Sequence, residues 1–129
     1  DTLVACRFPR HAVLGKPRDE AHAREMLHNL SRAPHEVITA MALIDPEGQS
    51  TVVADTTLVY MRAMSEADID AYIATGEWQG KAGAYGIQGK ADRYVERIEG
   101  SFSNVVGLCV KRTKLLMNKF GIISAKQEK

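Results

Sequence analysis

The amino-acid sequence predicts an α/β fold in a single domain, and three observations support this prediction. Four short runs of apolar and β-branched residues are typical of strands. Three longer segments carry apolar residues every three or four positions, as the buried face of a helix does. The chain of 129 residues is long enough to bury about two thirds of its unfolded surface. We expect one domain over residues 1–129, with a disordered tail at 124–129.

The first half of the chain is expected to form three strands and one helix. Thr2 to Cys6 is short and apolar, with β-branched residues at two positions, so it predicts a strand. Pro17 and the acidic residues after it mark the start of a helix that ends near Ser31. Glu36 to Ile44 is apolar almost throughout, which indicates a strand covered on both faces. A turn rich in Pro and Gly leads to a second strand, Ser50 to Met61, so the two should form an antiparallel hairpin.

The second half is expected to form two helices, a long loop and one strand. A Ser-Glu-Ala-Asp sequence resembles a capping box and predicts a helix over 65–75. Residues 76–92 contain five glycines and form the predicted loop, and residues 94–98 alternate as a strand does. Residues 106–120 place apolar side chains between basic ones and are followed by Gly121, a pattern typical of a helix with a glycine C-cap.

Composition argues against several classes of protein. The net charge of +1 gives no general reason to expect binding to nucleic acid or to an anionic membrane. No apolar run approaches the roughly 20 residues of a membrane span. Cys6 and Cys109 form no CxxC pair and no signal peptide is present, which favours a reducing, cytoplasmic setting. The four histidines are scattered, which predicts surface positions rather than a metal site.

The glycine-rich loop is the strongest candidate for a ligand site. Glycines allow the backbone to approach a ligand closely and to turn N–H groups toward an anion. Lys81 would offer a charge to a phosphate, and Gln88 would offer a donor and an acceptor to a base or a phosphate. No Walker or Rossmann pattern is present, so the spacing alone also fits a surface loop with a solvated lysine.

Two further positions are candidates because of their neighbours. Lys16 stands just before a predicted helix start, where a cation and a helix N-terminus together attract phosphate, although a solvated lysine is the simpler interpretation of that tripeptide. Asp1, at the head of a strand, would suit a magnesium ligand or a general base. Asp55 heads a similar Asp-Thr pair within a strand pattern, and composition does not choose between the two aspartates.

Taken in order, these motifs resemble the Maf family of nucleoside triphosphate pyrophosphatases. The segment Lys81–Gly89, KAGAYGIQG, carries the resemblance most specifically. Asp1-Thr2 and Gly15-Lys16-Pro17 precede it in the family's order, and Asn104–Leu108 follows it. The resemblance covers nearly the whole chain, to about Gly121. In the family the catalytic aspartate belongs to the Asp-Thr pair that precedes the Gly-Lys-Pro lysine, so the resemblance implies Asp1 rather than Asp55.

The resemblance implies a mixed β-sheet flanked by helices, with a nucleotide-binding cleft, as in Maf and ITPase-like proteins. It implies hydrolysis of dTTP and UTP, or of modified nucleotides, to the monophosphate and pyrophosphate, which would cleanse the nucleotide pool. A divalent cation, Mg²⁺ or Mn²⁺, and a homodimer are implied in the same way. The implied functional residues are the proton acceptor or metal ligand Asp1, the phosphate-facing Lys16 and Lys81, and the specificity positions Thr2 and Gln88.

Several features depart from the family's pattern. Gly80, Lys90-Ala91 and Cys109 replace the residues usual at those positions and leave the preferred base open. The family's Ser-x-Ser-Pro-Arg-Arg phosphate loop would lie before Asp1, and the chain has no initiator Met. We therefore expect an N-terminally incomplete chain that is a weak or inactive enzyme alone. The alternative function is a noncatalytic nucleotide-binding regulator of cell division or septum formation on the same fold.

Overall fold

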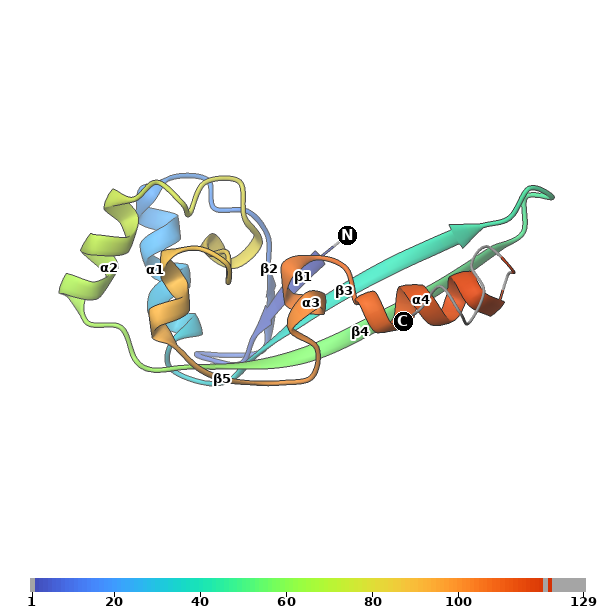
Figure 1. The fold of residues 1–129 in the computed structure, drawn as a ribbon. Coiled ribbons are helices and arrows are strands. Elements are labelled where there is room, and N and C mark those ends of the chain that lie inside the picture. Colours follow the sequence, from blue (N-terminus) through green and yellow to red (C-terminus); the bar gives the residue numbers. More distant parts are fainter. Residues whose placement is uncertain (1, 120, 122–129) are drawn as a thin grey trace.

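The computed structural model describes residues 2–119 and Gly121, and its centre is one five-stranded sheet (Figure 1). The strand order is β2-β1-β3-β4-β5. The strands are β1 (Thr2–Cys6), β2 (Ala12–Leu14), β3 (His35–Ile44), β4 (Ser50–Met61) and β5 (Val95–Glu99). The predicted α/β class and the β3–β4 hairpin are confirmed. The implied mixture of parallel and antiparallel strands is not found among the described residues.

All four neighbouring strand pairs of the described residues are antiparallel. The reason is clearest for β3 and β4, which are joined by a tight turn, because a connection of that length permits antiparallel pairing only. The turn is built on Asp45, whose carboxylate accepts hydrogen bonds from the backbone N–H groups of Glu47 and Gln49.

Four α-helices and two short 3₁₀ helices accompany the sheet in the described residues. They are α1 (Glu20–Leu30), α2 (Glu66–Ala74), η1 (Ala82–Ala84), η2 (Lys90–Tyr94), α3 (Phe102–Val106) and α4 (Val110–Lys119). The continuous helix predicted over 106–120 is wrong, because the chain leaves the helical conformation at Gly107, where φ is 141°. Phe120 and the predicted tail at 124–129 lie outside the described residues.

Both α1 and α2 begin at side-chain caps, and the cap of α2 is the one that the sequence predicts. Asp19 caps α1 by accepting a hydrogen bond from the backbone N–H of His22 at 2.8 Å. Ser65 and Asp68 form the predicted capping box of α2, with reciprocal side-chain to backbone bonds of 3.1 and 3.0 Å. The face of α1 that points to the sheet carries the predicted i, i+3, i+4, i+7 pattern: Ala23, Met26, Leu27 and Leu30.

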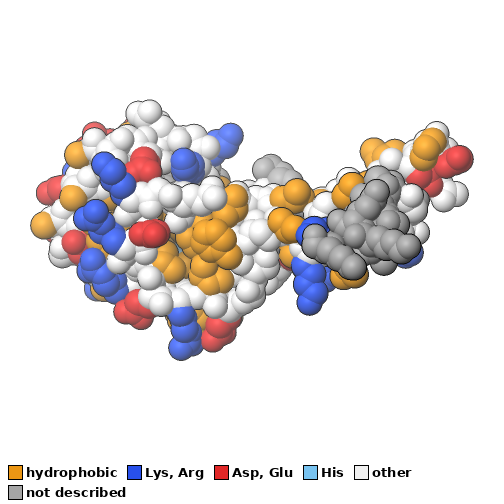
Figure 2. Space-filling model, in the orientation of Figure 1, with side chains coloured by type: hydrophobic (Ala, Val, Ile, Leu, Met, Phe, Trp, Pro, Cys, Tyr) orange, Lys and Arg blue, Asp and Glu red, His pale blue; other side chains and the backbone are white. Residues whose placement is uncertain are grey.

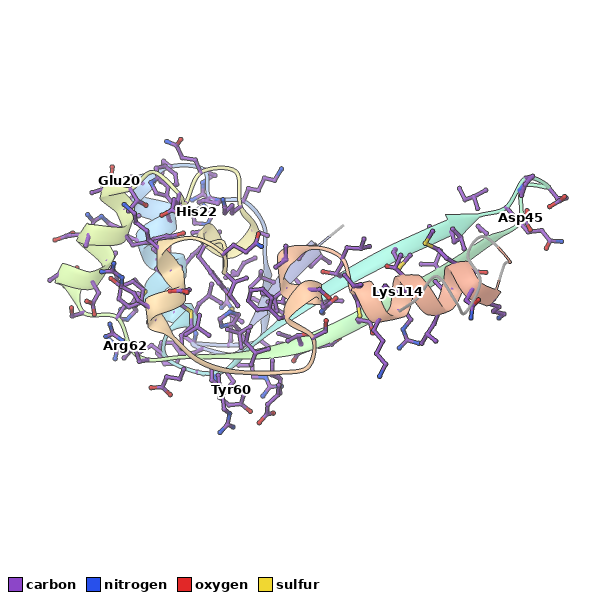
Figure 3. All side chains as sticks on the ribbon, in the orientation of Figure 1. Glu20, His22, Asp45, Tyr60, Arg62 and Lys114 are labelled. Carbon is purple, nitrogen blue, oxygen red and sulfur yellow. The ribbon has the colours of Figure 1, made fainter. Side chains whose placement is uncertain are left out.

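The core lies at one end of the sheet, in a lobe formed by the inner ends of the strands with α1, α2, η1 and η2. The outer ends of β3 and β4 project beyond this lobe as an arm, and α4 lies along it (Figure 1). In Figure 3, Asp45 marks the tip of this arm and Lys114 marks α4, far from Glu20 and Arg62 in the lobe. None of the described helices combines the length and the apolar composition that a membrane crossing requires.

The arm corrects one sequence prediction. The run from Glu36 to Ile44 predicted a strand covered on both faces, yet only its first half is buried on one face. Ile44 is 68% exposed, and Val52 on the paired strand is 67% exposed. A continuous apolar run is therefore compatible with a partly exposed ladder, because the pairing of β3 with β4 continues to Ile44 and Ser50, beyond the core.

Candidate functional site

A cleft of about 490 Å³ opens where the start of β1, the loop before α1 and the glycine-rich loop meet. Thr2, Lys16, Lys81 and Gln88 all line it, although they come from segments far apart in the sequence. Asp1 adjoins Thr2 in the chain but lies outside the described residues. The structure thus brings together the four described candidate residues, whose roles stay predictions.

A direct backbone contact joins the two lysine-bearing loops. The N–H of Gly83 donates a hydrogen bond of 3.1 Å to the carbonyl of Gly15, the residue before Lys16. Gly83 adopts φ of 73°, and a side chain there would meet Val4 and Leu30 at 3.1 to 3.2 Å. Ala84 adopts φ of 70°, a left-handed conformation that is uncommon for a residue with a Cβ. The loop is therefore held in a strained shape by its buried packing.

The two lysines are exposed cations at the rim of the cleft. Neither Lys16 nor Lys81 forms a salt bridge with any residue that the structure describes. The side chain of Lys81 crosses Gly86, where a Cβ would lie only 2.7 Å from Lys81 Cε. Two unpaired positive charges beside a glycine-rich backbone favour an anionic ligand such as a phosphate chain.

A buried pair supports the cleft from below. The Nε2 of His35 lies 2.6 Å from the hydroxyl of Tyr85, which lines the cleft, and the two rings meet edge to face. Burial lowers the pKa of His35 to about 4, and the backbone carbonyl of Leu30 offsets part of this shift. Within the described residues, the Nδ1 atom of His35 has no hydrogen bond of good geometry. Burial also raises the pKa of Tyr85. The pair is therefore uncharged at neutral pH and contributes shape rather than charge.

His35 corrects the expectation that the histidines lie on the surface. Its side chain is fully buried, and no local pattern marks it because its partner lies 50 residues later. Tyr85 stands within the KAGAYGIQG motif, so the sequence locates that half of the pair, but not its partner.

A second buried network reaches Thr2 from the opposite side. The hydroxyls of Thr2 and Thr39 lie 2.9 Å apart, and Thr39 donates to the backbone carbonyl of Asn104 at 2.7 Å. The Asn104 side-chain amide in turn donates to the carbonyls of Val37 and Asp55 at 3.1 and 2.9 Å. This network fixes the start of β1 relative to β3, β4 and α3.

Asp55, the alternative to Asp1, lies outside the cleft lining. It pairs with Arg112 of α4 at 3.3 Å, and its side chain is 21% exposed. In the sheet register Asp55 faces Thr39, which faces Thr2, so two strand spacings separate it from the lining residue Thr2. Its position fits an ion pair between the sheet and α4.

The described lining of the cleft contains no carboxylate. Within the described part of the chain, no three His, Cys, Asp or Glu side chains are grouped as a metal site would require. The described lining alone therefore suits an anion better than a cation.

Comparisons with known proteins give this site a context. A family model described as "Maf-like protein" matches residues 1–120. A curated relative from Paramagnetospirillum magneticum, named dTTP/UTP pyrophosphatase, is 46% identical over 121 residues, which are 94% of this chain and 62% of the relative. Relatives of the same name from Pasteurella multocida and Syntrophomonas wolfei are 50% and 46% identical, over 85% and 94% of this chain and 54% and 63% of their own lengths. The chain thus spans between about half and two thirds of the length of these relatives.

Proposed function

The chain belongs to the Maf family, and on that premise we propose that the protein hydrolyses dTTP and UTP to the monophosphate and pyrophosphate. The observation that carries the proposal is the meeting of Lys16, Lys81 and Gln88 at one cleft, with their loops joined by the Gly83–Gly15 hydrogen bond. Two cations suit a triphosphate, and an amide side chain suits a base edge. The names of the relatives support the same substrates.

In the proposed reaction, water attacks the α-phosphorus, and the bond to the oxygen that bridges to the β-phosphorus breaks. That oxygen leaves with the pyrophosphate, and its developing negative charge is stabilised by Lys16 and Lys81. The proton of the attacking water passes to the carboxylate of Asp1. The monophosphate and pyrophosphate are thus the two products of one hydrolysis.

We also propose that a divalent cation, Mg²⁺ or Mn²⁺, takes part. Since the described lining has no carboxylate, such an ion would be held by Asp1 and by phosphate oxygens of the substrate, a mode that Mg²⁺ commonly uses. When bound, it would neutralise charge on the phosphates. Loss of turnover in EDTA, restored by added Mg²⁺ or Mn²⁺, is the expected result.

The setting of the reaction is part of the same proposal. We propose a cytoplasmic enzyme that acts on the nucleotide pool, because the sequence has two isolated cysteines. No nucleic-acid partner is proposed, because the net charge is only +1. A homodimer is proposed from the family resemblance.

The proposal is tested by measuring pyrophosphate release from dTTP, UTP, CTP and 7-methyl-GTP, using the protein in the length that its gene encodes. We expect turnover of dTTP and UTP, and a loss of about 100-fold or more in Asp1→Ala. Asp55→Ala is the matched control and should retain most of the activity, since Asp55 pairs with α4. Nucleotide binding without turnover in the unaltered protein would instead support the noncatalytic regulator.

A further inference from the structure

The placement of Gln88 at the cleft depends on its backbone. Within the described residues, no hydrogen bond holds its side chain, which is exposed. Gln88 lies in a turn closed by the N–H of Gly89, which donates to the carbonyl of Gly86 at 3.1 Å. Its neighbour Ile87 is buried and anchors the turn to the core. Whatever holds the two ends of this turn therefore sets where the Gln88 side chain leaves the backbone and which way it starts.

Both ends of the turn are glycines, and a charged side chain crosses each of them. Lys81 lies against Gly86 at one end, as described above. At the other end, the carboxylate of Glu77 occupies the space that a Cβ on Gly89 would need. Lys81 is a predicted phosphate ligand, but Glu77 belongs neither to the motif nor to the cleft lining.

The Glu77 carboxylate is bonded to the backbone next to this turn. Both of its oxygens accept from the N–H of Lys90, at 3.2 and 3.3 Å. Lys90 is the first residue of η2, and the N-cap residue Gly89 has no side chain with which to cap the helix. Glu77 therefore supplies, from 13 residues earlier, the cap that the helix lacks.

Glu77 is itself fixed at the end of α2. Its backbone N–H donates to the hydroxyl of Thr75, the C-cap residue, at 3.1 Å. The neighbouring Trp78 donates from its indole to the carbonyl of Ile73 at 3.2 Å. Glu77 thus connects the end of α2 to the turn that carries Gln88, and its side chain is half-buried there.

We propose that Glu77 is a positioning residue for nucleobase recognition, which holds the Gly86–Gly89 turn so that Gln88 faces the base of the bound nucleotide. The proposal rests on the proposed function for its substrate. It separates recognition of the base, which depends on Glu77, from binding of the phosphates, which depends on the lysines.

The experiment compares Glu77→Ala with the unaltered protein, using dTTP as substrate and inorganic triphosphate as a competitive inhibitor that has no base. We expect Glu77→Ala to raise the KM for dTTP at least tenfold and to change the inhibition constant of triphosphate less than twofold. Glu77→Gln keeps an oxygen that accepts from Lys90, so it should restore the KM to within about threefold. Gly89→Ala leaves Glu77 in the chain but displaces it, and should reproduce the effect of Glu77→Ala.

Glu96→Ala, which removes an exposed carboxylate of β5, is the control for charge alone and should change neither constant. Equal weakening of dTTP and triphosphate in Glu77→Ala would overturn the inference, because a general loss of structure would produce it. An unchanged KM for dTTP would overturn it as well.

A second measurement does not depend on turnover. In nitrogen-15 NMR spectra, Glu77→Ala should shift the backbone amide signal of Gln88 and speed hydrogen exchange at Lys90, while the Glu96→Ala spectrum stays unchanged at both. If the unaltered protein releases no pyrophosphate, the proposed function fails by itself. An unshifted Gln88 signal would show instead that Glu77 does not position the turn.

Discussion

The lobe and the arm use the same two strands in opposite ways. At their inner ends, β3 and β4 bury Val37 and Val59 against α1 and the first strand, and this end holds the cleft. At their outer ends, the same hairpin is covered mainly by α4, which Arg112 and Thr113 tie to Asp55 and Met41. Figure 2 shows the arm as a narrow extension of the broader lobe. The comparison shows that β3 and β4 stay paired beyond the buried core. We therefore expect the lobe to contribute most of the free energy of unfolding.

The largest difference is expected for matched leucines. Leu27 of α1 is 1% exposed in the lobe, whereas Leu115 of α4 is 54% exposed beside the arm. Leu27→Ala should lower the free energy of unfolding by about 2–5 kcal/mol, since it leaves a cavity. Leu115→Ala should lower it by less than about 1 kcal/mol. Urea unfolding measures both, and equal losses would show that the arm is as tightly packed as the lobe.

Acid should weaken the lobe through His35. Because burial lowers the pKa of His35 from 6.5 to about 4, the unfolded state binds a proton more readily between these values. The stabilisation is therefore complete above about pH 6.5 and is lost as the pH falls toward 4, with a total on the order of 3 kcal/mol. His35→Gln should show a smaller loss over the same window in urea unfolding at pH 7 and pH 4.5. A parallel loss in the variant would assign the acid sensitivity to other groups.

The junction between lobe and arm should depend on Asn104. Its amide donates to backbone carbonyls of both β3 and β4, and these bonds are lost without it. Asn104→Ala should therefore lower the free energy of unfolding by about 2 kcal/mol. Asn118→Ala on α4, whose side chain is half-buried, is the control, with an expected change within about 0.5 kcal/mol. Thermal unfolding measures the stability of both variants. A loss in Asn104→Ala alone would assign the effect to the hydrogen-bond network, whereas equal losses would reflect a general cost of removing an amide side chain.

The smallest effect is expected on the arm itself. Val52 is 67% exposed and pairs with Ala42 across the hairpin. Val52→Thr keeps the β-branched shape and should change the free energy of unfolding by no more than about 0.5 kcal/mol. A loss above 1 kcal/mol in a urea titration would mean that another surface covers this face in solution.

Features that depend on neighbouring residues could be predicted from the sequence. The capping box of α2 and the buried stripe of α1 are local, and the sequence pattern of each matches the structure. The break between α3 and α4 had a visible signal in Gly107, a glycine inside a helical pattern. The ordered motifs indicated which residues would converge on the cleft, and four of the five are described there.

Contacts between distant residues could not be predicted in this way. The His35–Tyr85 pair and the Asn104 network join residues 50 and 67 positions apart, and such partners leave no periodic signal. Glu77 is a similar case, because its carboxylate would suit a solvated loop equally well until its bond to Lys90 is seen. The exposure of Ile44 was mispredicted because apolarity and β-branching do not reveal how far a core extends along a strand.

The backbone N–H of Gly83 is hydrogen-bonded to the carbonyl of Gly15, so the exchange of this one proton reports on opening of the cleft. That amide can exchange with solvent deuterium only when the two lysine-bearing loops separate, so its exchange rate measures how often the cleft opens. A nucleotide that bridges Lys16 and Lys81 would slow this exchange in proportion to its occupancy. Occupancy of the cleft would thus be readable without any chemical turnover, from the lifetime of a single backbone N–H.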